Sequence, residues 1–147
     1  MLCPKTVGAG AYRARHANLL PGRLPVTARL EQWTLDVRDV AAMARFWAAV
    51  LGYRIGDDGQ HLWPPPDTGP HAPSVWLQPV DEPTPGKNRG HPDLVPVDGD
   101  VDAEVERLLG LGAQRVDVGQ SGDEGFVVLA DPEGNEFCLL RRRVDPV

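Results

Sequence analysis

The stretch VAAMARFWAAVLGY, residues 40–53, holds the pattern that decides the fold. Asp39 stands before it as a helix N-cap, and Gly52 follows its apolar run as a C-terminal stop. The apolar residues recur at three- and four-residue steps, which places them on one face of a helix. They are Val40, Met43, Ala44, Trp47, Val50 and Leu51. The sequence therefore predicts an amphipathic helix, with Trp47 in the core.

Strand-like segments lie on both sides of this helix. The segment before it carries apolar residues at Leu30, Trp33, Leu35 and Val37. Short strands are predicted after it, over residues 53–55, 60–63 and 74–80. The stretch PPPDTGPHAP between the last two is a loop by composition. The order of strand, helix and three strands makes a βαβββ unit.

The same order returns 60 positions later, where Leu111-Gly112 repeats Leu51-Gly52. Asp100 and Gly112 bound a second helix, which follows a strand-like segment over residues 91–97. Further strands are expected over residues 114–118, 126–130 and 136–141, and the DPEGN turn joins the last two. The apolar face of this helix is formed by Val101, Val105, Leu108, Leu109 and Leu111. The chain is therefore an internal repeat of two βαβββ modules.

Two such modules are expected to form one domain. A single module leaves a sheet edge open and has one helix to cover its sheet, so a pair buries more surface. We predict an α+β domain over residues 28–143, with module one at 28–80 and module two at 88–143. Its eight strands would form a curved sheet around a cleft, with the helices on the outer faces. Residues 1–27 are expected to be a disordered extension and 144–147 a tail.

Composition excludes several classes of protein. A net charge of -6 and a pI near 5.1 argue against nucleic-acid binding, and residues 141–143 are the only basic run. No apolar stretch approaches the roughly 20 residues that span a bilayer. The two cysteines, Cys3 and Cys138, have neither metal-type nor disulfide-framework spacing, so the cytoplasm is the expected compartment. No nucleotide cofactor is expected.

Four segments carry a family resemblance: VAAMARFWAAVLGY, KNRGHPDL, VDAEVERLLGLGAQRV and FVVLADPEGNEFCLL. As a set they resemble the vicinal oxygen chelate superfamily, which includes glyoxalase I, extradiol dioxygenases and bleomycin or fosfomycin resistance proteins. The likeness is closest to its bacterial glyoxalase-like domains and covers roughly residues 28–142. Because the same paired-module scaffold carries several chemistries and some metal-free binders, the resemblance implies the fold more strongly than a reaction.

The resemblance also implies a site. In metal-dependent members, ligands come from the first and last strands of each module, which implies Gln32, His91 and Glu136 here. Gln32 and His91 lie 59 positions apart, close to the repeat offset. The fourth position falls on Trp76 or Gln78, which share one strand face, and only Gln78 has a side-chain oxygen to offer.

The first functional hypothesis is a metal-dependent enzyme. Amide, imidazole and carboxylate donors suit zinc, nickel, cobalt, manganese or iron. The ion would chelate neighbouring oxygens of a small substrate, and Glu136 would be both ligand and base in lyase, isomerase or dioxygenase chemistry. Trp63, Trp76 and Cys138 are expected to line the substrate pocket. The other histidines, His16, His61 and His71, are not expected to be ligands.

Two alternatives stay open. A metal-free module would bind a drug or metabolite between aromatic walls, with His91 and Glu136 as hydrogen-bonding groups. A degenerate paralogue would use the cleft as a protein interface. Relatives often dimerise, and in some the cleft is completed across chains, so the resemblance also implies a homodimer.

Overall fold

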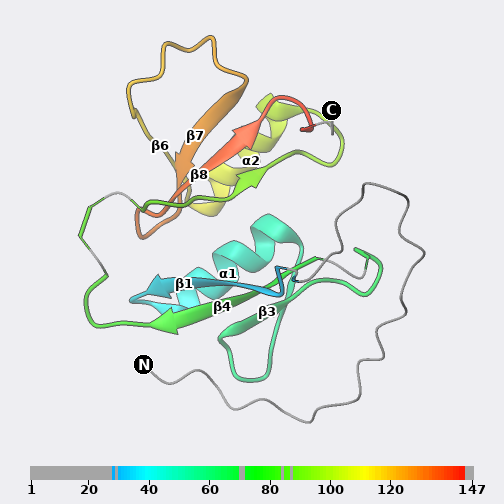
Figure 1. Ribbon diagram of the computed structural model, residues 1–147, viewed down its shortest axis with the longest axis vertical. Helices are drawn as coiled ribbons and strands as arrows, with labels where there is room; N and C mark the ends of the chain where they lie inside the picture. The colour runs from blue at the N-terminus through cyan, green and yellow to red at the C-terminus, as the bar shows by residue number, and fades with distance from the viewer. Residues whose placement is uncertain (1–27, 29, 70–71, 84, 87, 145–147) are drawn as a thin grey trace.

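The structure, a computed structural model, describes residues 28, 30–69, 72–83, 85, 86 and 88–144 (Figure 1). Predictions for residues 1–27, which include Cys3 and His16, and for His71 lie outside this range. Module one contains β1 (Gln32–Val37), α1 (Val40–Leu51), β2 (Arg54–Ile55), β3 (His61–Trp63) and β4 (Ser74–Pro79). Module two contains β5 (Asp93–Leu94), α2 (Val101–Leu111), β6 (Gln114–Arg115), β7 (Phe126–Ala130) and β8 (Glu136–Leu140).

The two predicted βαβββ modules are confirmed, and their eight strands form two four-stranded sheets. The strand orders are β1-β4-β3-β2 and β5-β8-β7-β6, so each sheet has the same topology. In each, the first strand runs parallel to the last, and the other pairs are antiparallel. The first strand of each module therefore lies at a sheet edge, which suits β5 because Pro92 has no N–H to donate to a second neighbour.

Both helices begin and end at the predicted capping residues. Asp39 accepts a hydrogen bond from the backbone N–H of Ala42, and Asp100 accepts one from Ala103. At the other ends, Gly52 and Gly112 adopt left-handed backbone conformations with φ of 68° and 108°. Residues other than glycine rarely adopt this backbone conformation, which interrupts the helix, so both helices end at these glycines.

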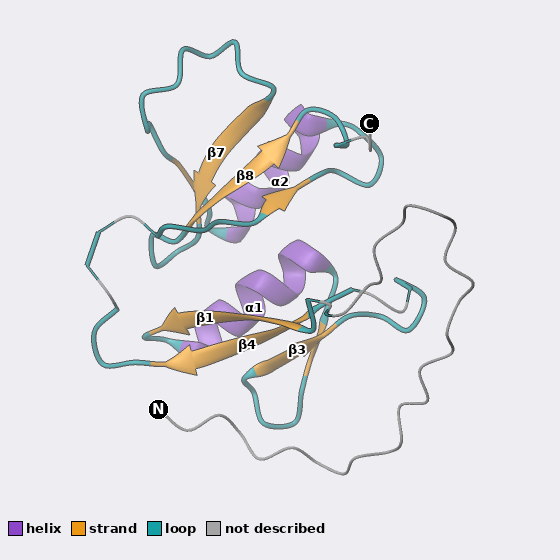
Figure 2. Cartoon of the chain, viewed as in Figure 1, coloured by secondary structure: helices purple, strands orange, loops and turns teal. Residues whose placement is uncertain are grey.

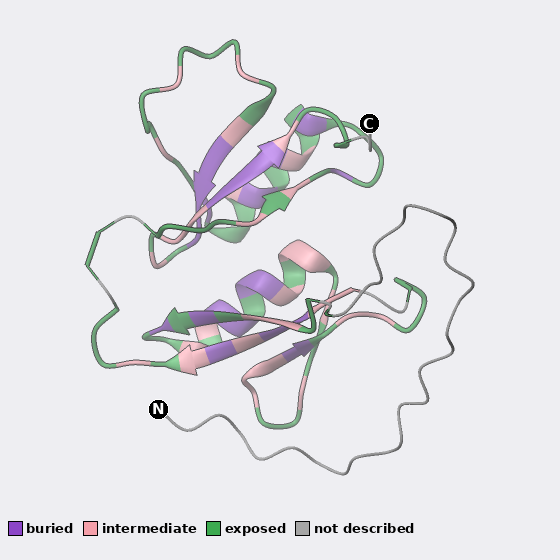
Figure 3. Cartoon of the chain, viewed as in Figure 1, coloured by how far each residue is buried: buried purple, intermediate pink, exposed green. Residues whose placement is uncertain are grey.

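One hydrophobic core joins the modules, and both helices contribute to it. Figure 2 shows α1 between the sheet of module one and the strands of module two. Trp47 of α1 is fully buried, as predicted, and contacts Phe137 of β8 with ring centroids 5.3 Å apart. Each sheet therefore turns one face toward the shared core, and the burial pattern of Figure 3 alternates along β1 and β4 accordingly.

The DPEGN turn forms a polar link between the modules. The fully buried Asp131 accepts a hydrogen bond from Nε1 of Trp47 at 3.0 Å. The same carboxylate accepts the backbone N–H groups of Glu133 and Asn135, which shapes the turn. The Glu133 carboxylate accepts the backbone N–H groups of Arg38 and Asp39, next to the start of α1. The turn that precedes β8 is therefore fastened to module one.

Within the described residues, no helix is both long and apolar enough to cross a membrane.

Candidate functional site

The open face of the module-two sheet is lined by alternate residues of β8. Phe137 and Leu139 point into the core, so Glu136, Cys138 and Leu140 lie on the opposite face. These three line a pocket of about 210 Å³, which His91, Asp93, Val118, Phe126 and Val128 complete. The predicted residues His91, Glu136 and Cys138 therefore border one cavity.

A group of metal-type donors stands at this pocket. Nε2 of His91 lies 3.3 Å from Oδ1 of Asp93. One donor atom from each of His91, Asp93 and Cys138 lies within 4.8 Å of the others. Nitrogen, carboxylate and sulfur donors at this spacing fit a first-row divalent ion after small side-chain rotations. Asp93 adds a carboxylate that the sequence-based set lacked.

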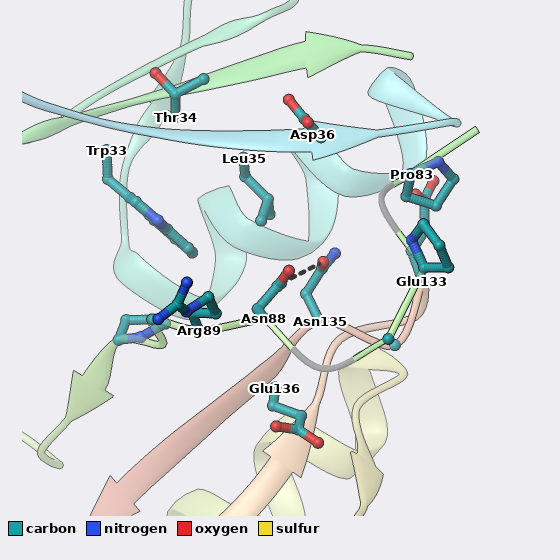
Figure 4. Close-up of a pocket in the computed structure, with 15 residues that line it drawn as sticks. Trp33, Thr34, Leu35, Asp36, Pro83, Asn88, Arg89, Glu133, Asn135 and Glu136 are labelled. Atoms are coloured by element: carbon teal, nitrogen blue, oxygen red, sulfur yellow. Dashed lines mark hydrogen bonds between the residues drawn. The ribbon is translucent and has the colours of Figure 1, made fainter. Parts of the chain in front are cut away.

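A larger pocket of about 610 Å³ lies between β1 and the start of β8, and Glu136 borders this one too. Figure 4 shows Trp33 and Leu35 pointing to the side of β1 where Glu136 lies, and Thr34 and Asp36 pointing to the other side. Gln32 shares the side of Thr34, since Nε2 of Gln32 donates to Oγ1 of Thr34 at 3.3 Å. Within one chain, Gln32 is therefore not on the face that carries Glu136.

Gln32 instead contacts a histidine of its own module. Its Oε1 lies 3.0 Å from Nε2 of His61, and Nδ1 of His61 lies 3.1 Å from Oδ2 of Asp58. Asp58 also accepts the backbone N–H groups of His61 and Gln60. These backbone hydrogen bonds, that of His61 first, hold the pKa of the Asp58 carboxyl below its usual value. The carboxylate is thus fixed as an anion beside the imidazole.

Two indoles enclose His61. Trp63 stacks on the imidazole with ring centroids 4.6 Å apart, and Trp76 meets its edge at 4.5 Å. Trp76 donates its Nε1–H to Oε1 of Gln78 at 3.1 Å, so the amide oxygen of Gln78 already accepts a hydrogen bond. The predicted pocket residues Trp63 and Trp76 therefore lie together, on the open face of module one rather than beside Cys138.

Sequence reasoning missed Asp93 and His61. Asp93 lies two positions after His91, and a strand brings such residues to one side, so the period of two could have found it. His61 was not expected to be functional because it belongs to a short hairpin. Its place beside Gln32 depends on the pairing of His61 with Trp76 across β3 and β4, a register that the sequence did not supply.

Comparison with known proteins identifies the family. A family model described as a glyoxalase-like domain matches residues 32–140, which include all the helices and strands of the described residues. The chain belongs to the glyoxalase-like domain family. Among curated proteins no match is found.

Solved structures share the fold of this glyoxalase-like protein at low sequence identity. A glyoxalase/bleomycin resistance protein/dioxygenase family enzyme from Burkholderia phytofirmans PsJN is 22% identical with a TM-score of 0.56, over 76% of this chain and 97% of that one. The fosfomycin resistance protein FosX from Mesorhizobium loti is 18% identical with a TM-score of 0.60, over 82% and 96%. A FosX variant from Listeria monocytogenes, in complex with Mn(II) and 1S,2S-dihydroxypropylphosphonic acid, is 14% identical with a TM-score of 0.59, over 82% and 94%.

Proposed function

We propose that this glyoxalase-like protein binds a small, oxygen-rich molecule at a divalent metal ion held by His91 and Glu136. The observation that carries the proposal is the cluster of His91, Asp93 and Cys138, whose donor atoms lie within 4.8 Å in a pocket that Glu136 also lines. Asp93 supplies a second carboxylate, which raises the negative charge available to a dication. Zinc, nickel, cobalt, manganese and iron all fit such donors.

The reaction class we propose is lyase, isomerase or dioxygenase chemistry on neighbouring oxygens. When bound, the ion would supply Lewis acidity toward those oxygens. The Glu136 carboxylate, at the first residue of β8, is placed to accept and return a substrate proton. The apolar side chains of Phe126, Val128 and Leu140 would exclude water from that transfer.

We further propose that the complete cleft forms between two copies of the chain. Gln32 lies on the open face of one sheet and Glu136 on the open face of the other. The opposite face of each sheet packs against the shared core, to which both helices contribute. Each open face also carries exposed aromatic area, with Trp63 at 41% and Phe126 at 37% exposure. A second copy would bring its Gln32 opposite His91 and Glu136.

Metal content tests the proposal. The full chain is reconstituted with each of Mn²⁺, Co²⁺, Ni²⁺ and Zn²⁺, and bound metal is measured after gel filtration. We expect one ion per chain in the wild type, with the loss of most of it in His91→Ala and Glu136→Gln. Asp123→Asn, in an exposed loop, removes an equal charge and should keep the metal. A wild type that retains none of these ions contradicts the proposal.

Metal-free binding is the second candidate, favoured by the cluster of Trp63, His61 and Trp76 rings on the open face of module one. Such a site would bind a planar ligand without an ion. A ligand that raises the melting temperature equally in the presence of a chelator, and equally in Glu136→Gln, would support this function over the metal-dependent one.

A further inference from the structure

A histidine nitrogen and an amide oxygen on the open face of module one have the spacing of two ligands of one metal ion. Oε1 of Gln32 and Nε2 of His61 lie 3.0 Å apart. Two donors that each bind one ion at about 2.1 Å, at right angles to each other, lie about 3.0 Å apart. An ion could bind both atoms with almost no movement of either side chain.

The orientation of the imidazole supports the same use. Nδ1 of His61 faces the Asp58 carboxylate at 3.1 Å, and an anionic carboxylate can only accept a hydrogen bond there. On the opposite side of the ring, Nε2 faces Oε1 of Gln32. Metal-binding histidines commonly have a carboxylate beside their other ring nitrogen, and Asp58 holds this position beside Nδ1 of His61.

The neighbouring strand explains why a ligand is needed at this place. The repeat puts the fourth ligand position at Trp76 or Gln78. An indole offers no lone pair to a metal, and the Gln78 oxygen accepts the Trp76 N–H. His61 is paired directly with Trp76 across β3 and β4 and lies on the same sheet face. It therefore offers a nitrogen donor one strand away from the fourth ligand position.

We propose that His61 is the missing protein ligand of the metal site, acting with Gln32, and that Asp58 positions its ring. The assignment rests on the proposed function, because His91 and Glu136 of a second copy supply the remaining ligands. It gives the site two imidazoles, one carried by each module, and makes Trp63 and Trp76 the walls that keep the His61 ring in place.

Paramagnetic NMR with Co²⁺ counts these imidazoles. Each histidine bound to Co²⁺ gives a far-shifted N–H signal that disappears in D₂O. At Co²⁺ concentrations high enough to saturate the weakened variants, we expect two such signals in the wild-type full chain, one in His61→Phe, which keeps an aromatic ring against both indoles, and one in His91→Phe. Asp58→Asn should keep two signals and weaken Co²⁺ binding about 10–100-fold, the effect typical of losing a carboxylate behind a metal-bound histidine.

The outcomes separate the two proposals. A wild type that binds Co²⁺ with a single signal, lost in His91→Phe and kept in His61→Phe, overturns the assignment of His61 and leaves the proposed function intact. A wild type that binds no Co²⁺ contradicts the proposed function and the His61 assignment together. The number of far-shifted N–H signals in the wild type tests the His61 assignment even if a variant fails to fold.

Discussion

Asp131 shows how one side chain can fix both a turn and a module interface. Its Oδ2 accepts hydrogen bonds from Nε1 of Trp47 and Nδ2 of Asn135, and its Oδ1 accepts two backbone N–H groups. Every partner is a donor, so the carboxylate suits the position and an amide does not. Burial of an anion is tolerated here because the donors replace its water.

Replacing Asp131 by Asn should therefore destabilise the fold. The amide NH₂ would face Trp47 or the turn as a second donor, and one buried donor would lose its acceptor. We expect the free energy of unfolding to fall by about 3 kcal/mol, measured by urea denaturation. Asp123→Asn makes the same chemical change in an exposed loop and should stay within about 0.5 kcal/mol of the wild type. Equal effects of the two substitutions would contradict the importance given to the turn.

The candidate site was only partly predictable at the scale of residues. The alternation along β8 correctly placed Glu136 and Cys138 on one face, because a strand has a fixed period of two. Sequence reasoning did not predict His61 as a site residue because its neighbours, Gln32 and Trp76, come from two other strands. Such contacts depend on strand register, which local sequence does not specify.

At the scale of elements, the helices were predicted more accurately than the strands. Both helices begin after the predicted Asp caps and end at the predicted Gly residues, because capping is a local interaction. The strand expected over residues 91–97 is reduced to β5, Asp93–Leu94. Pro92 and Pro96 flank it and have no N–H for a ladder, which explains the short element.

Two glycines at the C-terminal end of α2, Gly110 within the helix and Gly112 at its C-cap, should respond in opposite directions to alanine. Gly110 lies inside the helix, and a Cβ there would meet no atom within 4 Å, so Gly110→Ala should stabilise the fold by about 1 kcal/mol. Gly112 has φ of 108°, and Gly112→Ala should destabilise it by about 1–2 kcal/mol. Thermal unfolding measures both. Shifts of the same sign would mean that α2 does not end at Gly112.

At the scale of the whole molecule, the packing of the helices decides how a complete cleft can form. Both helices lie in the core that joins the sheets, so the open faces of the two modules point away from that core. Gln32 and His61 are on one of these faces, and His91 and Glu136 border the pocket on the other. A site that uses both sets requires module one of one copy and module two of another.

Mixed dimers test this arrangement directly. Gln32→Ala and His91→Ala chains, each with a different affinity tag, are co-expressed, and the heterodimer is isolated through both tags. If each site takes Gln32 from one chain and His91 from the other, one site of the heterodimer carries both substitutions and the second carries neither. We expect one tightly bound Co²⁺ per heterodimer, where the wild-type homodimer binds two and each variant homodimer binds at least tenfold more weakly.

A site built within a single chain gives the opposite result. Every site of the heterodimer would then carry one substitution, and its Co²⁺ affinity would match that of the variant homodimers. Analytical ultracentrifugation of the wild type is the accompanying measurement, because a monomer at the concentrations used for metal binding would also contradict the two-chain cleft. Neither variant homodimer is expected to bind Co²⁺ tightly. Tight Co²⁺ binding in the heterodimer therefore requires a site whose Gln32 and His91 come from different chains.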